Sequence, residues 1–306
     1  MNKKQNSKTF LPPKSDIVFR MLFGDEHSKR ILSSFIKAIL DMPEEEFETI
    51  TVTDPHLLPE YEGGKLGILD IKVKTATGHH LNIEMQVNPL EEIGQRIEFY
   101  NAKMLVDQIG SSDGYSVLKR TINILVADHI LFPESSSYYH CFKRYDIKRK
   151  VEFPGVTEIY TLELPKLPEI SDNTLLWDWL YFLSAKTEED FEMIAEKNNA
   201  VKEAVIKLEV LSKDERARLL HESLEKKWRD DMSREQSAER RGRELGKELG
   251  KELGKELGKE LGKEIGEQQG IAMAKKVLRL SLEEKSPEEI ADLCKIPLEK
   301  VIEILE

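Results

Sequence analysis

Residues 68–88 decide the fold and read I-L-D-I-K-V-K-T-A-T-G-H-H-L-N-I-E-M-Q-V-N. Apolar and polar residues alternate with period two in both halves, which is typical of two β-strands that each turn one face toward a core. Residues 76–78, A-T-G, have the composition of a turn. The stretch therefore predicts an antiparallel hairpin with its turn centred on Thr77.

The register of this hairpin places two acids opposite each other. With the turn centred on Thr77, Asp70 lies directly across from Glu84, with Cβ atoms roughly 4.5–5.5 Å apart. Two opposed carboxylates destabilise a sheet unless positive charge lies between them, and Mg²⁺ prefers such oxygen clusters. The pattern predicts a metal site, but it also fits an ordinary hairpin with a solvated polar face, where Lys72 and Lys74 neutralise the acids.

Composition limits the class of protein. The 306 residues, 40% hydrophobic and 34% charged, suffice for one sizeable core and a small extra module. No apolar run approaches the length of a membrane span and the N-terminus lacks a signal-peptide core, so we expect no membrane partner. The two distant cysteines predict neither a disulfide framework nor a zinc site, which favours a cytoplasmic location.

Charge is unevenly distributed. The net charge of −11 argues against a generic nucleic-acid binder. One short segment, however, sets five cations against the single acid Asp146: Lys143, Arg144, Lys148, Arg149 and Lys150. A local patch can attract a polyanion even when the total charge is negative, so these residues are candidate DNA contacts. Solvated side chains on a loop fit the pattern equally well.

The rest of the chain predicts helices around a sheet. Helical patterns cover residues 15–23, 25–40, 91–109 and 174–229. Strands are expected at 50–53, 121–127, 138–142 and 158–164, and 121–127 is apolar enough for a buried central strand. A long loop is expected from 54 to 67. This order indicates an α/β or α+β fold.

A tetrapeptide repeat occupies residues 242–270: G-R-E-L, four copies of G-K-E-L, G-K-E-I, then G-E-Q-Q-G. Each four-residue step advances about 40° beyond a full helical turn, so the leucines spiral, and each glycine costs a helix about 1 kcal/mol. We expect a weak helix or linker, stable mainly when another chain packs on it; self-association and a passive linker remain open. The predicted parts are a domain over 1–231, the repeat region over 232–270 and a small helical hairpin over 271–306.

Several motifs follow one another in a recognisable order. Residues 14–24, K-S-D-I-V-F-R-M-L-F-G, are similar to a D-x-x-F-K-x-x-F-G helix, with Arg20 in place of Lys. Asp70 with residues 84–86 resembles a D…E-x-Q core, 95–100 an R-x-x-x-Y helix, and 162–166 a late E-L-P-K strand. Over almost its whole length the chain resembles the PD-(D/E)XK nuclease family transposases, the Rpn group of recombination-promoting nucleases.

The resemblance implies a restriction-endonuclease-like α/β core, a mixed sheet flanked by helices, that cuts DNA with Mg²⁺ or another divalent cation such as Mn²⁺. Asp70 and Glu84 would hold the metal, and Asp16 would reach it through water, although a plain helix cap explains Asp16 equally well. Gln86 shares the face of Glu84 and would orient the attacking water, in a place where the wider superfamily usually has Lys. Lys72 is the candidate for the missing positive charge.

Gln95 and Arg96 are expected to contact phosphate, since a guanidinium suits phosphate geometry. The resemblance also implies roles in recombination, mobile-element processing or phage defence, with DNA as partner. From the repeat, and because cutting both strands of a duplex needs two active sites, we expect a homo-oligomer formed through the C-terminal region. A second hypothesis is a catalytically weak or inactive nuclease-fold protein that acts as an interaction or regulatory module; Gln86, the acidic total charge and the repeat favour it. A glycosidase use of the acid pair is a distant third, because no sugar-binding aromatic platform is evident.

Overall fold

The computed structural model describes residues 10–54, 56–57, 67–68 and 70–306. The basic residues 1–9, most of the expected loop at 54–67, and Leu69 of the hairpin lie outside the described residues. The chain divides into two compact units, one up to residue 226 and one from residue 227 to 306, and each is described by itself. Of the helices described, none combines the length and the apolar content that a membrane crossing requires.

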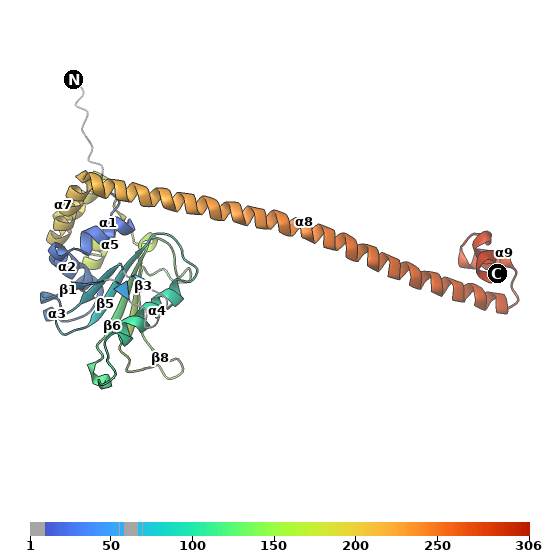
Figure 1. The fold of residues 1–306 in the computed structure, drawn as a ribbon, viewed down its shortest axis with the longest axis horizontal. Coiled ribbons are helices and arrows are strands. Elements are labelled where there is room, and N and C mark those ends of the chain that lie inside the picture. The colour runs from blue at the N-terminus through green and yellow to red at the C-terminus, as the bar shows by residue number, and fades with distance from the viewer. Residues whose placement is uncertain (1–9, 55, 58–66, 69) are drawn as a thin grey trace, which may run out of the picture. The chain divides into compact units, whose positions relative to one another are not determined.

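The first unit is built on a six-stranded mixed sheet (Figure 1). Its strand order is β1-β4-β5-β6-β10-β7. The bounds are β1 Thr51–Thr53, β4 Ile71–Lys74, β5 His80–Gln86, β6 Thr121–Ala127, β7 Tyr139–Phe142 and β10 Thr157–Glu163. Strands β5, β6 and β10 are parallel to one another, whereas β1, β4 and β7 are antiparallel to their neighbours. The prediction of a mixed sheet flanked by helices is confirmed.

Two short strand pairs lie outside this sheet and were not predicted. One pairs β2 (His56–Leu57), inside the segment expected to be loop, with β3 (Gly67–Ile68), which joins the last residue of that loop to the first residue of the predicted hairpin. The other pairs β8 (Tyr145–Asp146) with β9 (Val151–Glu152), inside the basic segment. Pairs this short leave little periodicity in the sequence from which to predict them.

The predicted hairpin register is confirmed. Ile71 pairs with Ile83 and Lys72 with Asn82, so the next pair along the ladder brings Asp70 level with Glu84. Gly78 in the turn has φ of 94°, in the left-handed region that glycine adopts without strain. Local alternation and turn chemistry were therefore enough to align the two acids.

Five helices share a hydrophobic core with one face of the sheet. Their bounds are α1 Asp16–Phe23, α2 Lys29–Ile39, α5 Leu175–Ser184, α6 Glu188–Lys197 and α7 Asn199–Lys213. The apolar positions of the hairpin, such as Ile71 and Ile83, join Phe19, Phe35 and Trp179 in one buried cluster. Each such side chain contributes roughly 1.5–3 kcal/mol when fully buried, so this core fixes the hairpin against α1.

Helix α4 (Ile93–Val106) contacts β6 and covers the opposite face of the sheet. It connects β5 to β6, and a connection between parallel strands must cross a face of the sheet. Asn82, Glu84 and Asn123 are consequently buried, with 0%, 1% and 0% of their surface exposed. An ordinary hairpin with a solvated polar face is therefore wrong for this chain.

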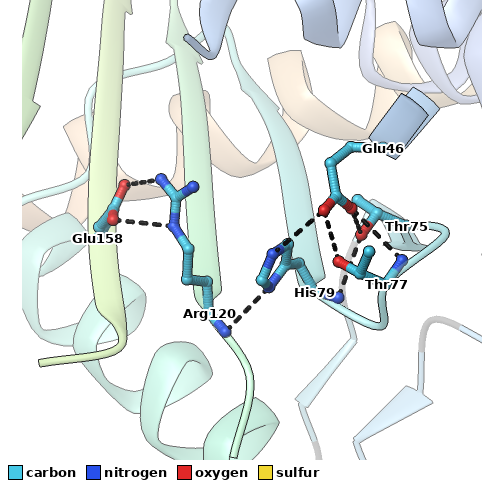
Figure 2. Close-up of polar contacts among 6 residues, drawn as sticks. All are labelled: Glu46, Thr75, Thr77, His79, Arg120 and Glu158. Carbon is cyan, nitrogen blue, oxygen red and sulfur yellow. Dashed lines mark hydrogen bonds and ion pairs between the residues drawn. The ribbon is translucent and has the colours of Figure 1, made fainter. Parts of the chain in front are cut away.

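At the edge where β5, β6 and β10 begin, polar side chains join separate elements (Figure 2). Glu46, in the short helix α3 (Glu45–Glu48), accepts hydrogen bonds from the hydroxyls of Thr75 and Thr77 at 2.7 and 2.5 Å. Across the sheet, Arg120 donates to both carboxylate oxygens of Glu158, at 3.1 and 2.7 Å. These contacts tie the hairpin turn to α3 and hold the first residues of β6 and β10 together.

The region predicted as helical from 174 to 229 divides into α5, α6, α7 and the start of α8 (Glu215–Leu282). Helix α8 continues without a break through the tetrapeptide repeat, so the repeat forms a helix rather than an irregular linker. In the second unit, α9 (Pro287–Cys294) and α10 (Leu298–Leu305) pack with the end of α8 around Val277, Ile290 and Val301.

Candidate active site

Two carboxylates meet where β4 begins and β5 nears its end. Glu84 accepts a hydrogen bond from Nδ2 of Asn82 at 2.8 Å through its Oε1 atom. Asp70 accepts the backbone N–H of Met85 at 3.0 Å through its Oδ2 atom. These bonds fix both acids on neighbouring strands with few rotamers left to either, which is the preorganisation that a ligand site requires.

Both acids hold their protons more tightly than free carboxyl groups do. Burial raises the pKa of Glu84 to about 7; Arg96 lowers it, and the negative charge of Asp70 raises it again. Burial likewise raises the pKa of Asp70 to about 6, with the N–H of Met85 opposing and the charge of Asp16 adding to the rise. Burial therefore disfavours the ionised form of both acids, and a bound cation would favour that form.

Arg96 of α4 is the cation in contact with Glu84. Its Nη2 atom lies 3.2 Å from Oε2 of Glu84, and its Nε donates to the hydroxyl of Tyr100 at 3.1 Å. The guanidinium also lies over the Tyr100 ring, 5.3 Å from its centre. The four-residue spacing places Arg96 and Tyr100 on one face of the helix. Gln95, the next residue back, is exposed to solvent.

Asp16 and Arg20 face the same region from α1. Ser15 occupies the N-cap position, and Asp16 is the first residue of the helix. The charges of both Asp16 and Arg20 act on Asp70, which places the start of α1 near the two buried acids. Arg20 was not predicted as a site residue, although its position one turn after Asp16 was a usable signal.

Gln86 and Lys72 make other contacts. Gln86 donates from Nε2 to the carbonyl oxygen of Asn88 at 2.8 Å, so it is anchored at the end of β5. Lys72 follows Ile71 in β4 and pairs with Asn82 of β5. Its Nζ atom is 3.8 Å from Oδ2 of Asp107, at the end of α4. The amino group of Lys72 is thus directed to α4 in this structure, and the guanidinium of Arg96 occupies the place beside Glu84.

The predicted basic cluster lies in another part of the fold. Its residues are exposed and form the β8–β9 hairpin, where Lys143 pairs with Glu152 at 3.3 Å and Arg149 with Asp146 at 2.9 Å. Phe142, just before the hairpin, pairs with Ile159 near the start of β10. Glu84 lies toward the opposite, carboxyl end of the parallel strands. The structure therefore does not bring these cations to the acid pair.

The E-L-P-K motif has a structural role. Glu163 is fully buried and accepts the backbone N–H of Leu131 at 2.8 Å. Lys166 lies 2.8 Å from Glu163 and donates to the carbonyl oxygen of Phe132 at 2.7 Å. Through these hydrogen bonds to its backbone, the motif holds the loop after β6 beside the carboxyl ends of the parallel strands. Sequence reasoning also missed Asn82, whose alternation with Glu84 on one face was the available signal.

The acid pair fits a hard divalent cation. Oε2 of Glu84 is buried and accepts no hydrogen bond from any described residue, so it remains available to a ligand beyond its ion pair. Within the described part of the chain, no three His, Cys, Asp or Glu side chains converge as a ready-made metal site. Mg²⁺ commonly binds through one or two carboxylates and completes its shell with water and substrate phosphate, so Asp70 and Glu84 suffice as protein ligands.

Comparison with protein-family models matches residues 13–238 to the PD-(D/E)XK nuclease family transposase. Searches of curated proteins and of solved structures found no match. The matched segment contains the first helix, the hairpin with both buried acids, α4 and the E-L-P-K strand. The chain therefore belongs to the PD-(D/E)XK nuclease family transposases.

Proposed function

We propose that the protein is a divalent-metal-dependent DNA endonuclease that acts in recombination or in the processing of mobile-element or phage-related DNA. The observation that carries this proposal is the buried pair of Asp70 and Glu84, whose raised pKa values support a place for a cation, as does the Oε2 atom of Glu84, which is ion-paired with Arg96 but accepts no hydrogen bond from a described residue. Family membership supports nuclease chemistry with DNA as substrate.

Asp70 and Glu84 hold the cation, Mg²⁺ or Mn²⁺, with Asp16 contributing through water. When bound, the cation neutralises charge on the scissile phosphate and lowers the pKa of a water molecule. Glu84 must be ionised to bind it, and Arg96 favours that ionised form. With a cation held by Asp70 and Glu84, Glu84 would no longer need the guanidinium of Arg96 as its counter-ion.

Gln86 and two cations complete the proposed chemistry. Gln86, anchored at the end of β5, orients the attacking water by hydrogen bonding. A Gln cannot supply the positive charge that Lys supplies elsewhere in the superfamily. Arg96, already beside Glu84, is the better placed substitute, and Lys72 is the second candidate if its amino group leaves Asp107.

Two surfaces are proposed to contact DNA. Gln95 and Arg96 lie on α4, where Arg96 pairs with Glu84, and both would bind the phosphates nearest the cut. The β8–β9 hairpin would bind backbone phosphates at a distance from the site. Its cations are Lys143, Arg144, Lys148, Arg149 and Lys150. Exposed Lys and Arg side chains bind phosphate through charge and without reading sequence.

We also propose that the protein is a homo-oligomer through its C-terminal region. Cutting both strands of a duplex requires two active sites, and two identical subunits are the simplest source. Light scattering on the full chain gives the mass directly.

A second candidate function is a nuclease-fold interaction module with little activity. The ion pair between Arg96 and Glu84 favours it, since the guanidinium already neutralises the acid that would bind metal. Gln86 in the place of Lys favours it as well.

Relaxation of supercoiled plasmid separates these two functions. Purified full-length protein is incubated with plasmid in Mg²⁺, in Mn²⁺, without metal and with excess chelator, and each fraction from a sizing column is assayed. The nuclease proposal requires nicking that follows the protein through the column and disappears with chelator. Protein that binds DNA in every condition without nicking it would establish the interaction module instead.

A further inference from the structure

The repeat segment of α8 presents apolar side chains that no described residue covers. Its six apolar positions keep between 45% and 59% of their surface exposed: Leu245, Leu249, Leu253, Leu257, Leu261 and Ile265. At each of the eight glycines from Gly242 to Gly270, the space that a Cβ would occupy is open. Glycine costs an isolated helix about 1 kcal/mol per position relative to alanine. Such a helix gains stability mainly from a packing partner.

The charge of the repeat identifies the class of partner. Each G-K-E-L copy holds one Lys and one Glu, so residues 242–265 carry no net charge. A neutral surface does not attract a polyanion such as DNA. A lipid surface is also a poor fit, because an interfacial helix keeps its apolar groups on one continuous face, whereas the Leu row here advances about 40° around the helix with every repeat. A complementary partner has apolar side chains that fit the space above the glycines, space that accepts the leucines, and both positive and negative side chains beside them.

A second copy of the same segment offers all three. In a helix, residues four apart form rows, and the four rows of this repeat run in the order Glu, Leu, Gly and Lys around the helix. The Leu row is a ridge, and the adjacent Gly row, with its open space, is a groove. Two helices whose four-residue ridges interdigitate cross at about −50°. We propose that two copies of this chain associate in parallel and cross within residues 245–265, with the Leu ridge of each in the Gly groove of the other around the crossing point.

Charge decides between parallel and antiparallel copies. When a parallel copy is turned to face the first, its row order reverses, so Leu meets Gly and each Glu row meets a Lys row. In the antiparallel arrangement the order is restored, and Leu meets Leu while Glu meets Glu and Lys meets Lys. Opposite charges at the rim of an interface favour one partner and repel another. This proposal specifies the homo-oligomer of the proposed function, but it does not depend on DNA cutting.

An inverted repeat provides a matched test. In this full-length variant each Lys and Glu of the repeat exchange places, giving G-E-K-L; the changed positions are Lys247, Glu248, Lys251, Glu252, Lys255, Glu256, Lys259, Glu260, Lys263 and Glu264. Composition and net charge stay the same. The inverted rows complement themselves in parallel, but they place like charges together when paired with the natural repeat.

Wild type and inverted variant, one carrying a mass tag, are mixed, allowed to exchange subunits and weighed by native mass spectrometry. The parallel crossing predicts two homodimers, with heterodimer about tenfold below its statistical share, since several rim pairs worth a few tenths of a kcal/mol each turn repulsive. Heterodimer at the statistical share would place the interface elsewhere, and an excess would indicate antiparallel pairing. A monomeric wild type would also overturn the proposal.

Filling the groove gives an independent test. Leucine at Gly246, Gly250, Gly254, Gly258 and Gly262 raises helix propensity and adds apolar surface. A groove that receives leucines predicts weaker association, with the dissociation constant raised about tenfold or more by overpacking. Circular dichroism verifies that the helix remains. Tighter association of this variant would mean that the repeat aggregates through apolar area alone, and the ridge-and-groove pairing would be wrong.

Discussion

Arg96 and Glu84 meet between α4 and β5, with Nη2 of the arginine 3.2 Å from Oε2 of the glutamate. Glu84 is 1% exposed, whereas the Arg96 side chain keeps 33% of its surface in solvent. The arginine is therefore the partner that solvent can reach, and we expect it to leave the pair when a cation binds to Glu84. Tyr100 holds it in reach of the site through a hydrogen bond and ring contact.

Loss of this arginine should make stability strongly dependent on pH. Arg96→Met leaves Glu84 buried without its counter-ion, which should lower the free energy of unfolding by about 1–3 kcal/mol at pH 8. The cost should shrink at pH 6, because Glu84 then binds a proton and becomes neutral. Urea denaturation at both pH values measures the difference. Arg149→Met, at an exposed pair, is the control and should change little; equal losses for Arg96→Met at both pH values would contradict the account.

The raised pKa of Glu84 predicts the sign of a second effect. Its folded-state pKa of about 7 lies above the ordinary value of 4.5, so the folded protein binds this proton more tightly than the unfolded chain. The resulting stability is fully present below pH 4.5 and is lost as the pH rises through 7. Glu84→Gln removes that loss and should stabilise the metal-free protein at pH 8 by about 1–3 kcal/mol. Chemical denaturation across pH 4.5–8 tests this; an unchanged pH slope in the variant would show that Glu84 does not titrate in this range.

Short-range sequence patterns predicted much of the fold and part of the candidate site. Period-two alternation and the turn at Thr77 are local, so they aligned Asp70 with Glu84 correctly. Burial of Glu84 is a tertiary effect, since α4 lies over a face that alternation alone assigns to solvent. Long flexible side chains were the least predictable, because sequence does not show that Lys72 reaches toward Asp107 while Arg96 turns to Glu84.

Two further segments, the repeat and the basic segment before β10, show the same limit of prediction from sequence. The repeated glycines predicted a weak helix or linker, because intrinsic helix propensity describes an isolated segment. In the structure, α8 continues as one helix through the repeat. The basic segment was read correctly as a charge cluster, but its position near the start of β10 depends on how β7 pairs, which no local pattern reveals.

Gln86→Lys should preserve or raise the rate of DNA nicking. The change adds the positive charge common in the superfamily at the end of β5, and a lysine ammonium can still donate to the carbonyl oxygen of Asn88. Plasmid relaxation rates at fixed metal concentration measure the effect, with Gln86→Ala as the matched comparison. If both variants are inactive but folded, Gln86 makes a hydrogen bond that a cation cannot replace.

Removal of charge from the β8–β9 hairpin should weaken DNA binding without affecting the fold. Its cations are exposed, so Lys148→Ala, Arg149→Ala and Lys150→Ala combined should leave the melting temperature unchanged. The slope of log affinity against log salt should fall by about three, one for each lost phosphate contact. Fluorescence anisotropy at several salt concentrations measures it. The control removes three exposed lysines elsewhere, at Lys186, Lys202 and Lys213; an equal loss there would mean that only total charge matters.

Plasmid nicking by alanine variants of Asp70 and Glu84 tests most directly whether this pair is the centre of metal-dependent DNA cutting. Asp70→Ala and Glu84→Ala are assayed in Mg²⁺ and Mn²⁺ beside wild type and Glu192→Ala, an exposed acid of α6, with a melting curve for each. Both site variants should stay folded and lose nicking by at least about a hundredfold, while Glu192→Ala retains it. Folded site variants that nick at the wild-type rate would contradict the assignment of this pair as the catalytic centre.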